Sequence, residues 1–171
     1  MKKNLTIALV LLFAIVAGAS AQEKSYKKVR IGLGAEGAIP TSAGYDYGAG
    51  ATFRVAIALD ETSAITGTTG VMAFIPKSIT GVNTKAQLNI PIKGGYKYMF
   101  NSTLYGLGEA GFTLARVYIP STTSGSLSSV SSTEFTYSAG VGAHLGGFDP
   151  SIRYEGYSSS GFIALRIGFN F

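Results

Sequence analysis

The side chains that could carry out chemistry in this chain are few, and they limit the reactions available to it. His144 is the only histidine and there is no cysteine. A multi-histidine metal site and a disulfide framework are therefore excluded. His144 could in principle form a hydrolytic triad with Glu155 and one of the many serines, but nothing in the sequence brings these groups together. We expect no enzymatic activity, no cofactor and no bound metal.

Two glycine motifs match the dinucleotide-binding pattern G-x-G-x-x-G. They are Gly32-Leu-Gly34-Ala-Glu-Gly37 and Gly106-Leu-Gly108-Glu-Ala-Gly111. A nucleotide site needs this motif between a strand and a following helix. Both motifs lie inside stretches with strand periodicity, and no helical pattern follows either of them. We interpret these glycines as wall positions that make room for long neighbouring side chains.

Several stretches alternate between apolar and polar or small residues. The strands that this pattern predicts would position the polar side chains. The clearest spans residues 161–171, where Ile163, Leu165, Ile167, Phe169 and Phe171 alternate with Ala164, Arg166, Gly168 and Asn170. This period predicts a strand with one apolar face and one small or polar face. The predicted strands are residues 28–39, 47–59, 63–75, 86–99, 103–118, 134–145, 148–157 and 161–171. Pro91 cannot donate to a ladder, so we expect a β-bulge there.

The predicted connections alternate in length. The longer ones are residues 41–46, 76–85, 120–133 and 158–161, and the shorter ones are residues 60–62, 101–102 and 146–147. The Ser-, Thr- and Gly-rich segment 121–133 is the longest, whereas Gly146-Gly147 is a hairpin signal. Long loops at one end and short turns at the other are typical of outer-membrane barrels.

Most strand-borne charges fall on the small and polar face. They are Arg30, Glu36, Arg54, Lys93, Lys97, Glu109, Arg153, Glu155 and Arg166, and Asp149 shares this face. A soluble sandwich would hide its apolar face instead. An Arg facing lipid at the midplane would cost about 2–4 kcal/mol. We therefore expect these charges to form a salt-bridge and hydrogen-bond plug in a narrow lumen that conducts ions poorly.

Composition and the N-terminal segment indicate the compartment. Lys2 and Lys3 precede an apolar run and the small-residue site Ala19-Ser20-Ala21, which predicts a signal peptide over residues 1–21 and one barrel domain over residues 22–171. The 14 basic residues are scattered among 9 acidic ones, which argues against nucleic acid. Without a second long apolar run, a membrane form must be a closed barrel.

The stretches Ile31–Pro40 and Phe148–Tyr157, together with the Phe171 ending, resemble the small outer-membrane protein β-barrel domain family, which includes OmpX- and OmpA-type eight-stranded barrels. The resemblance implies an antiparallel up-and-down transmembrane β-barrel in the cell outer membrane. It also implies that Ile167, Phe169 and Phe171 are an assembly signal read by the barrel-assembly machinery. The expected partners are outer-membrane lipid and lipopolysaccharide, whose phosphates the outward-facing Arg116 could meet. We expect a monomer.

These observations predict a structural, non-enzymatic envelope protein whose exposed loops mediate surface interaction. Three alternatives stay open. One is a lipid-modifying enzyme that resembles lipid A deacylases and uses His144. Another is a narrow channel or small-ligand carrier. The third is a soluble lipocalin-like carrier, which would point its bulky apolar side chains inward.

Overall fold

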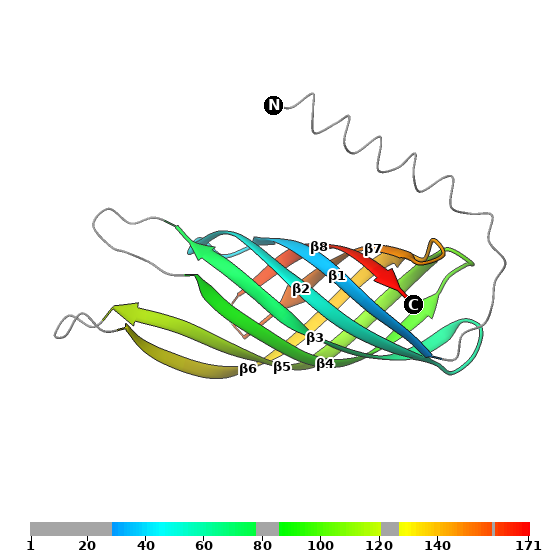
Figure 1. Ribbon diagram of the computed structural model, residues 1–171, viewed down its shortest axis with the longest axis horizontal. Coiled ribbons are helices and arrows are strands. Elements are labelled where there is room, and N and C mark those ends of the chain that lie inside the picture. Colours follow the sequence, from blue (N-terminus) through cyan, green and yellow to red (C-terminus); the bar gives the residue numbers. More distant parts are fainter. Residues whose placement is uncertain (1–28, 78–85, 121–126, 159) are drawn as a thin grey trace, which may run out of the picture.

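The computed structural model describes residues 29–77, 86–120, 127–158 and 160–171, so the predicted signal peptide lies outside it. These residues form eight strands: β1 (Val29–Pro40), β2 (Tyr45–Ala58), β3 (Ser63–Pro76), β4 (Gln87–Met99), β5 (Leu104–Pro120), β6 (Leu127–Ala143), β7 (Phe148–Gly156) and β8 (Gly161–Asn170). Each strand pairs antiparallel with its sequence neighbours, and β1 also pairs with β8. The predicted up-and-down barrel is therefore confirmed (Figure 1).

The two ends of the barrel differ in which segments they contain (Figure 1). We call one the terminal end, where β1 begins, β8 ends, and residues 59–62, 100–103 and 144–147 form turns. The other is the loop end, where β1, β3, β5 and β7 end and β2, β4, β6 and β8 begin. Among the described residues there is no helix with the length and hydropathy that a membrane crossing requires.

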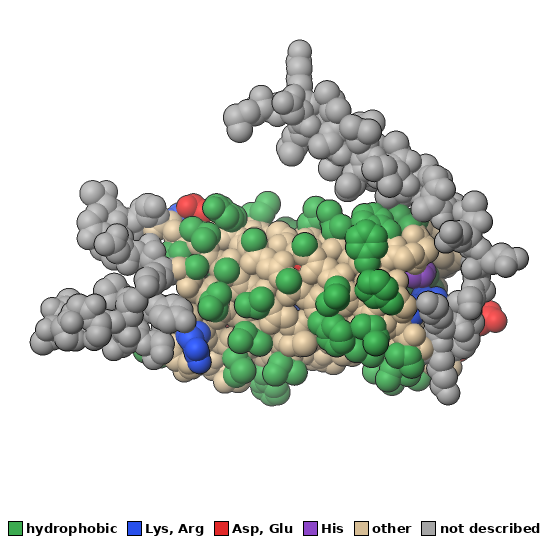
Figure 2. Space-filling view, in the orientation of Figure 1, with side chains coloured by type: hydrophobic (Ala, Val, Ile, Leu, Met, Phe, Trp, Pro, Cys, Tyr) green, Lys and Arg blue, Asp and Glu red, His purple; other side chains and the backbone are tan. Residues whose placement is uncertain are grey.

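Side-chain direction follows the predicted parity. Leu33, Ile92 and Phe112 on the outer wall are 56%, 59% and 58% exposed, whereas Lys93 and Arg166 inside are 3% and 0% exposed. Figure 2 shows the consequence on the visible face, where hydrophobic side chains are spread along the wall with backbone and other side chains between them, and charged ones appear mainly near its ends. This arrangement is the reverse of a soluble barrel with a wetted exterior, so the lipocalin-like alternative is wrong.

The bulge predicted at Pro91 is absent. The β3–β4 ladder has no pair at Pro91 or Ile90 but resumes in the same register, and the β4–β5 ladder runs through Pro91 without a shift. Proline lacks only the donor, so the ladder can skip a bond and keep its register. The register shift lies instead in β2 at Asp46, between the pairs Tyr45–Pro76 and Tyr47–Ile75.

Residues 127–133 of the long connection predicted over residues 121–133 belong to a strand, and residues 121–126 lie outside the described residues. β5 and β6 are 17 residues long each, and their pairing continues from Val117–Val130 to Pro120–Leu127. The Ser- and Thr-rich composition suggested a loop, but ladder hydrogen bonds to β5 give this backbone its partners. The result is a β5–β6 hairpin that projects beyond the other strands at the loop end (Figure 1).

The β6–β7 turn also differs from the prediction. The strand predicted over residues 134–145 would place Leu145 on the outer face beside Phe135 and Val141, but β6 ends at Ala143 and Leu145 is buried. Gly146 adopts a φ of 65°, and Leu145 and Phe148 exchange backbone hydrogen bonds of 2.9 and 3.1 Å. The predicted Gly-Gly turn thus starts at Leu145 and ends the inward–outward alternation of the strand there. The positive φ of Gly146 allows the chain to reverse direction at this point.

The β2–β3 turn is held by a carboxylate. Asp60 Oδ1 accepts hydrogen bonds from the Thr62 N–H at 2.7 Å and the Ser63 N–H at 2.8 Å, and the Ser63 hydroxyl donates to Oδ2. The bonds from Ser63 and Thr62 lower the pKa of Asp60 to about 2. Asp60 is therefore ionised at neutral pH and engaged by its own turn.

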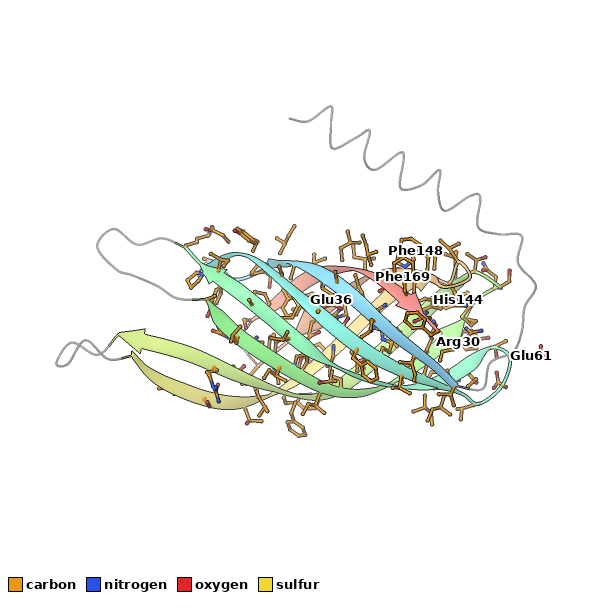
Figure 3. The ribbon with its side chains drawn as sticks, viewed as in Figure 1. Arg30, Glu36, Glu61, His144, Phe148 and Phe169 are labelled. Carbon is orange, nitrogen blue, oxygen red and sulfur yellow. The ribbon has the colours of Figure 1, made fainter. Side chains whose placement is uncertain are left out.

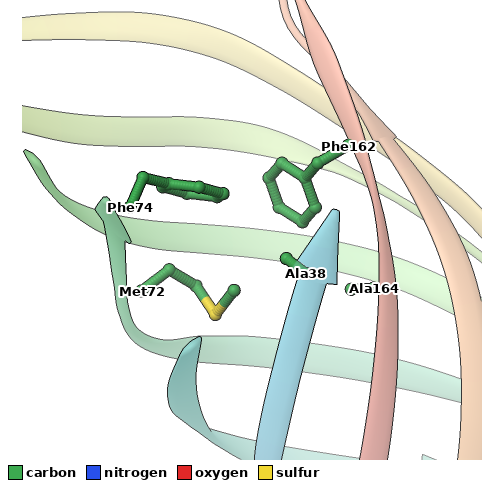
Figure 4. Close-up of a cluster of buried hydrophobic side chains, with 5 residues drawn as sticks. All are labelled: Ala38, Met72, Phe74, Phe162 and Ala164. Atoms are coloured by element: carbon green, nitrogen blue, oxygen red, sulfur yellow. The ribbon is translucent and has the colours of Figure 1, made fainter. Parts of the chain in front are cut away.

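An apolar layer fills the lumen towards the loop end. Phe74 of β3 and Phe162 of β8 face each other with ring centroids 5.1 Å apart, and Met72 lies beside them (Figure 4). Ala38 and Ala164 leave room for these larger groups. Met72, Phe74 and Phe162 have the same strand parity as the lumen charges, which is why they point inward although they are apolar.

Candidate functional site in the barrel lumen

A bidentate ion pair inside the lumen joins β7 to β1, the two strands that flank β8. Arg153 Nη1 and Nη2 donate to the two carboxylate oxygens of Glu36 at 2.6 and 2.7 Å. Both side chains are nearly inaccessible to solvent. Charge-assisted bonds in this fork geometry are the strongest hydrogen bonds that side chains form. The pair therefore ties two strands that are far apart in the sequence.

A second group of charges continues from Arg153. Arg153 Nε donates to Glu155 Oε2 at 3.1 Å, and Lys93 Nζ contacts the same oxygen at 2.7 Å. Lys93 also lies 3.2 Å from Glu109 Oε2. Glu109 accepts further hydrogen bonds from the hydroxyls of Thr68 at 2.5 Å and Ser138 at 3.2 Å. Carboxylates and cations thus alternate across β1, β4, β5 and β7.

The network ends around Asp149 towards the terminal end. Asp149 accepts hydrogen bonds from the Tyr105 hydroxyl at 2.5 Å and the Asn170 amide at 2.6 Å. Arg166 Nη1 lies 3.4 Å from Asp149 Oδ1, and Lys97 Nζ lies 3.6 Å from Oδ2. The Lys97 ammonium also lies 3.6 Å from the centroid of the Tyr105 ring, a cation–π contact.

Glycines of the first motif make room for the network. A Cβ on Gly34 would lie 2.6 Å from Arg166 Nε, and one on Gly168 would also collide with that guanidinium. By contrast, Gly37 faces outward with open space around it. The structure thus places Gly34 against a long side chain in a strand, as predicted, and the motif has no phosphate-binding turn.

The predicted lumen residues separate into two groups. The structure brings together Glu36, Arg54, Lys93, Lys97, Glu109, Arg153, Glu155 and Arg166, directly or through Asp149 and Thr68. Arg30 is different, because it is half-buried at the terminal end and forms no ion pair with any described residue (Figure 3). Thr68 and Ser138 lie on the predicted polar face. Their contacts with Glu109 depend on the register of the paired strands, which the sequence alone does not give.

The predicted assembly-signal residues lie on the outside of the barrel. Ile167, Phe169 and Phe171 are all exposed, and Phe169 packs against Phe148 of β7 with ring centroids 5.5 Å apart (Figure 3). Their recognition by an assembly machinery stays a prediction.

His144 and Glu155 do not meet. His144 lies in the β6–β7 turn at the terminal end, while Glu155 lies near the loop end of β7 and is engaged by Lys93 and Arg153. From Phe148 to Glu155 the strand alone spans about 23 Å at 3.3 Å per residue. Burial, with repulsion from Arg30 and Lys97, lowers the pKa of His144 to about 4. The geometry gives this histidine no triad partner in Glu155.

Two cavities flank the filled section of the lumen. At the loop end, a cavity of about 170 Å³ lies against Tyr45, Phe74, Tyr157 and Phe162. At the terminal end, a cavity of about 60 Å³ lies against Arg30, Arg54 and Lys97. No group of three or more potential metal-binding side chains occurs in the part of the chain that the structure describes. Between the cavities, the side chains of the network and the apolar layer occupy the lumen.

Comparisons with known proteins agree with this architecture. The model of the outer membrane protein β-barrel domain family matches residues 7–160. Among solved structures, Ail, the attachment invasion locus protein of Yersinia pestis, has a TM-score of 0.61 at 15% identity, covering 84% of this chain and 97% of Ail. The N-terminal β-barrel domain of Pseudomonas aeruginosa OprF also scores 0.61, at 13% identity, covering 83% and 97%.

Neisserial surface protein A gives a third comparison, with a TM-score of 0.55, 15% identity, and coverage of 86% of this chain and 98% of that protein. At these identities the solved structures support the fold alone. No curated protein sequence matches the chain.

Proposed function

Since this chain belongs to the outer membrane protein β-barrel domain family, we propose that it acts as a structural outer-membrane protein with a closed lumen and no catalytic activity. The outer membrane is its location, and its apolar wall faces the hydrocarbon layer. In this proposal the terminal end faces the periplasm and the loop end faces the outside. The observation that carries the proposal is the set of buried, mutually paired charges that fills the lumen.

A filled lumen predicts a barrel that is closed to ions. An eight-stranded barrel is just wide enough for its own side chains, and here the ion pair between Lys93 of β4 and Glu155 of β7 reaches across it. Purified protein in planar bilayers is expected to give no steady single-channel current. A reproducible, ion-selective conductance in the unaltered protein would overturn the closed-lumen proposal and favour the channel alternative.

The absence of catalysis is tested through lipid A. Cells with the unaltered protein, cells with His144→Gln and cells without the protein are expected to show the same lipid A profile by mass spectrometry. A lipid A species that disappears both in the deletion and in His144→Gln would establish the enzyme alternative. Heat-modifiable gel migration shows in parallel that the variant barrel is folded.

The loop end is the proposed surface for interaction. The β5–β6 hairpin extends there beyond the other strands (Figure 1), and Arg116 is exposed on the outer wall of β5. A guanidinium on the outer wall near the loop end can form charge-assisted hydrogen bonds with lipopolysaccharide phosphates. Lipopolysaccharide is expected to raise the thermal unfolding temperature of the unaltered barrel more than that of Arg116→Gln. An equal rise would contradict the proposed contact.

A small-ligand carrier is the second candidate, favoured by the loop-end cavity. Aromatic rings line it, and the buried Thr113 hydroxyl on its wall has no hydrogen-bond partner among the described residues. Gln87, Asn89 and Glu134 also line this cavity. Ring stacking combined with several polar contacts suits a small amphipathic molecule. Screening small aromatic and sugar compounds by quenching of tyrosine fluorescence tests this, because Tyr45 and Tyr157 line the cavity. Quenching that Phe162→Ala abolishes would support a carrier.

A further inference from the structure

The terminal-end cavity is lined by three cations, which come from three strands, and by the carboxylates of Asp60, Glu61 and Asp149. Arg30 of β1, Arg54 of β2 and Lys97 of β4 line a volume of about 60 Å³ that opens beside the β2–β3 turn. A buried water needs about 10–15 Å³ of such volume, so the cavity has room for several waters or one small anion. Figure 3 shows Arg30 and His144 at this end, with Glu61 at the tip of the turn.

Arg54 is the least satisfied charge at this cavity. The residue is only 4% exposed. Its Nε donates to Thr68 Oγ1 at 3.2 Å and lies 3.8 Å from Glu109 Oε1. Its Nη1 and Nη2 are buried and have no hydrogen-bond partner within the described part of the chain. A guanidinium cannot escape by losing its proton. Its ion-pair partner Glu109 is shared with Lys93 and leaves two of the guanidinium's nitrogens without an acceptor.

The nearby carboxylates are already engaged. Asp149 accepts hydrogen bonds from Tyr105 and Asn170 and faces Lys97 and Arg166. Asp60 is occupied by the hydroxyl and N–H groups of its own turn. Glu61 also lines the cavity, but it is exposed at the tip of the turn. The lining of the cavity therefore leaves the two terminal nitrogens of Arg54 without an acceptor.

The balance of buried charges in the lumen also favours an anion at this cavity. In the described lumen, the buried cations are Arg54, Lys93, Lys97, Arg153 and Arg166, and the buried acids are Glu36, Glu109, Asp149 and Glu155. Arg30 adds a further positive charge at the mouth. The excess is positive, and the unpartnered guanidinium of Arg54 lies at the cavity where it could be neutralised.

We propose that the terminal-end cavity binds one small inorganic anion, such as chloride or phosphate. Arg30, Arg54 and Lys97 line the space that the anion would occupy. Because Arg54 Nη1 and Nη2 are buried in this structure, the guanidinium has to turn towards the cavity to donate to the anion. The anion completes the hydrogen bonding of Arg54 and balances the lumen. This site goes beyond the closed-lumen function and does not depend on it, because a closed barrel with a solvated Arg54 would be equally impermeable.

Bromide is a direct probe of this site. Crystals of the unaltered protein grown with sodium bromide are expected to show an anomalous peak within contact distance of Arg54 Nη1 or Nη2. A peak there supports the proposal. Ordered water at both nitrogens with no anomalous signal would overturn it, and this result does not require any variant to fold.

A solution titration separates specific binding from surface attraction. Line broadening of chloride-35 NMR by the folded barrel in zwitterionic micelles should be reversed by inorganic phosphate. Arg54→Gln is expected to weaken chloride binding at least tenfold, while Arg116→Gln on the outer wall leaves it unchanged. Arg30→Gln, at the half-exposed mouth, should weaken it less than Arg54→Gln. Equal broadening by the unaltered protein and Arg54→Gln would refute the site.

Discussion

The middle of the lumen is filled by charged side chains, whereas its loop end is filled by apolar side chains. In the middle, Arg153, Glu36, Lys93 and Glu155 pair with one another at distances of 2.6–3.1 Å. At the loop end, Met72, Phe74 and Phe162 meet through apolar contacts. Both regions lie behind the same apolar outer wall, so exposure to lipid does not decide which filling is used.

This difference shows that the two regions depend on their neighbours in different ways. A buried charge needs its particular partner, because loss of one member leaves the other unpaired and desolvated. An apolar side chain needs only neighbours of suitable volume. The middle of the lumen should therefore respond to substitution in coupled pairs, and the loop end should respond in proportion to the volume removed.

The largest expected effect comes from breaking the central pair. Arg153→Met leaves Glu36 buried without its bidentate partner and is expected to lower the free energy of unfolding by about 3–5 kcal/mol. Adding Glu36→Gln should restore much of that loss. Urea unfolding in lipid vesicles, followed by circular dichroism because the chain has no tryptophan, measures both. Two additive losses would contradict the coupling.

A somewhat smaller and graded effect is expected at the apolar layer. Phe162 is 2% exposed and packs on Phe74. Phe162→Ala should cost about 3 kcal/mol, at the lower end for Phe-to-Ala changes because a cavity already adjoins the ring. Phe162→Leu should cost less than about 1.5 kcal/mol. The same unfolding assay applies, and equal costs for the two variants would show that ring volume is not what stabilises this layer.

The glycine motif offers a matched pair that sharpens the comparison. Gly34→Ala places a methyl group 2.6 Å from Arg166 Nε and should cost about 1–3 kcal/mol by overpacking. Gly37→Ala, in the same motif but facing open space, should change stability by less than about 0.5 kcal/mol. Heat-modifiable gel migration at increasing temperature compares them. Similar behaviour of the two variants would refute the crowding of Arg166.

The smallest expected effect is the pH dependence contributed by His144. Its pKa is about 4 in the folded barrel, below its ordinary 6.5, because of burial and of repulsion from Arg30 and Lys97 that Asp149 only partly offsets. The unfolded chain thus takes up the proton first. This contribution to stability is complete above pH 6.5 and declines as pH falls towards 4.

His144→Gln removes that decline while keeping a polar side chain in the turn. Between pH 7 and pH 5 the unaltered barrel should lose more stability than His144→Gln in the same urea assay. Parallel pH profiles for the two proteins would show that His144 does not titrate differently on folding.

Much of this architecture could be predicted locally. The period-two pattern around Ile163, Leu165 and Ile167 sets which side chains face lipid, because successive strand residues point to opposite faces. The same parity placed Arg54, Lys93 and Arg153 inside. Composition misled at residues 127–133, where pairing with β5 overrode a loop-like sequence, and at Pro91, where the ladder skipped a bond without shifting register.

The sequence by itself determined the faces of the strands, and the family follows from that pattern. Which inward side chains meet was decided only by the tertiary structure. Glu36 and Arg153 are 117 residues apart, and Phe74 reaches Phe162 only because barrel closure brings β3 and β8 to facing walls. Alternation is a local property of each strand, whereas contacts across a lumen depend on the register of every ladder around the closed sheet.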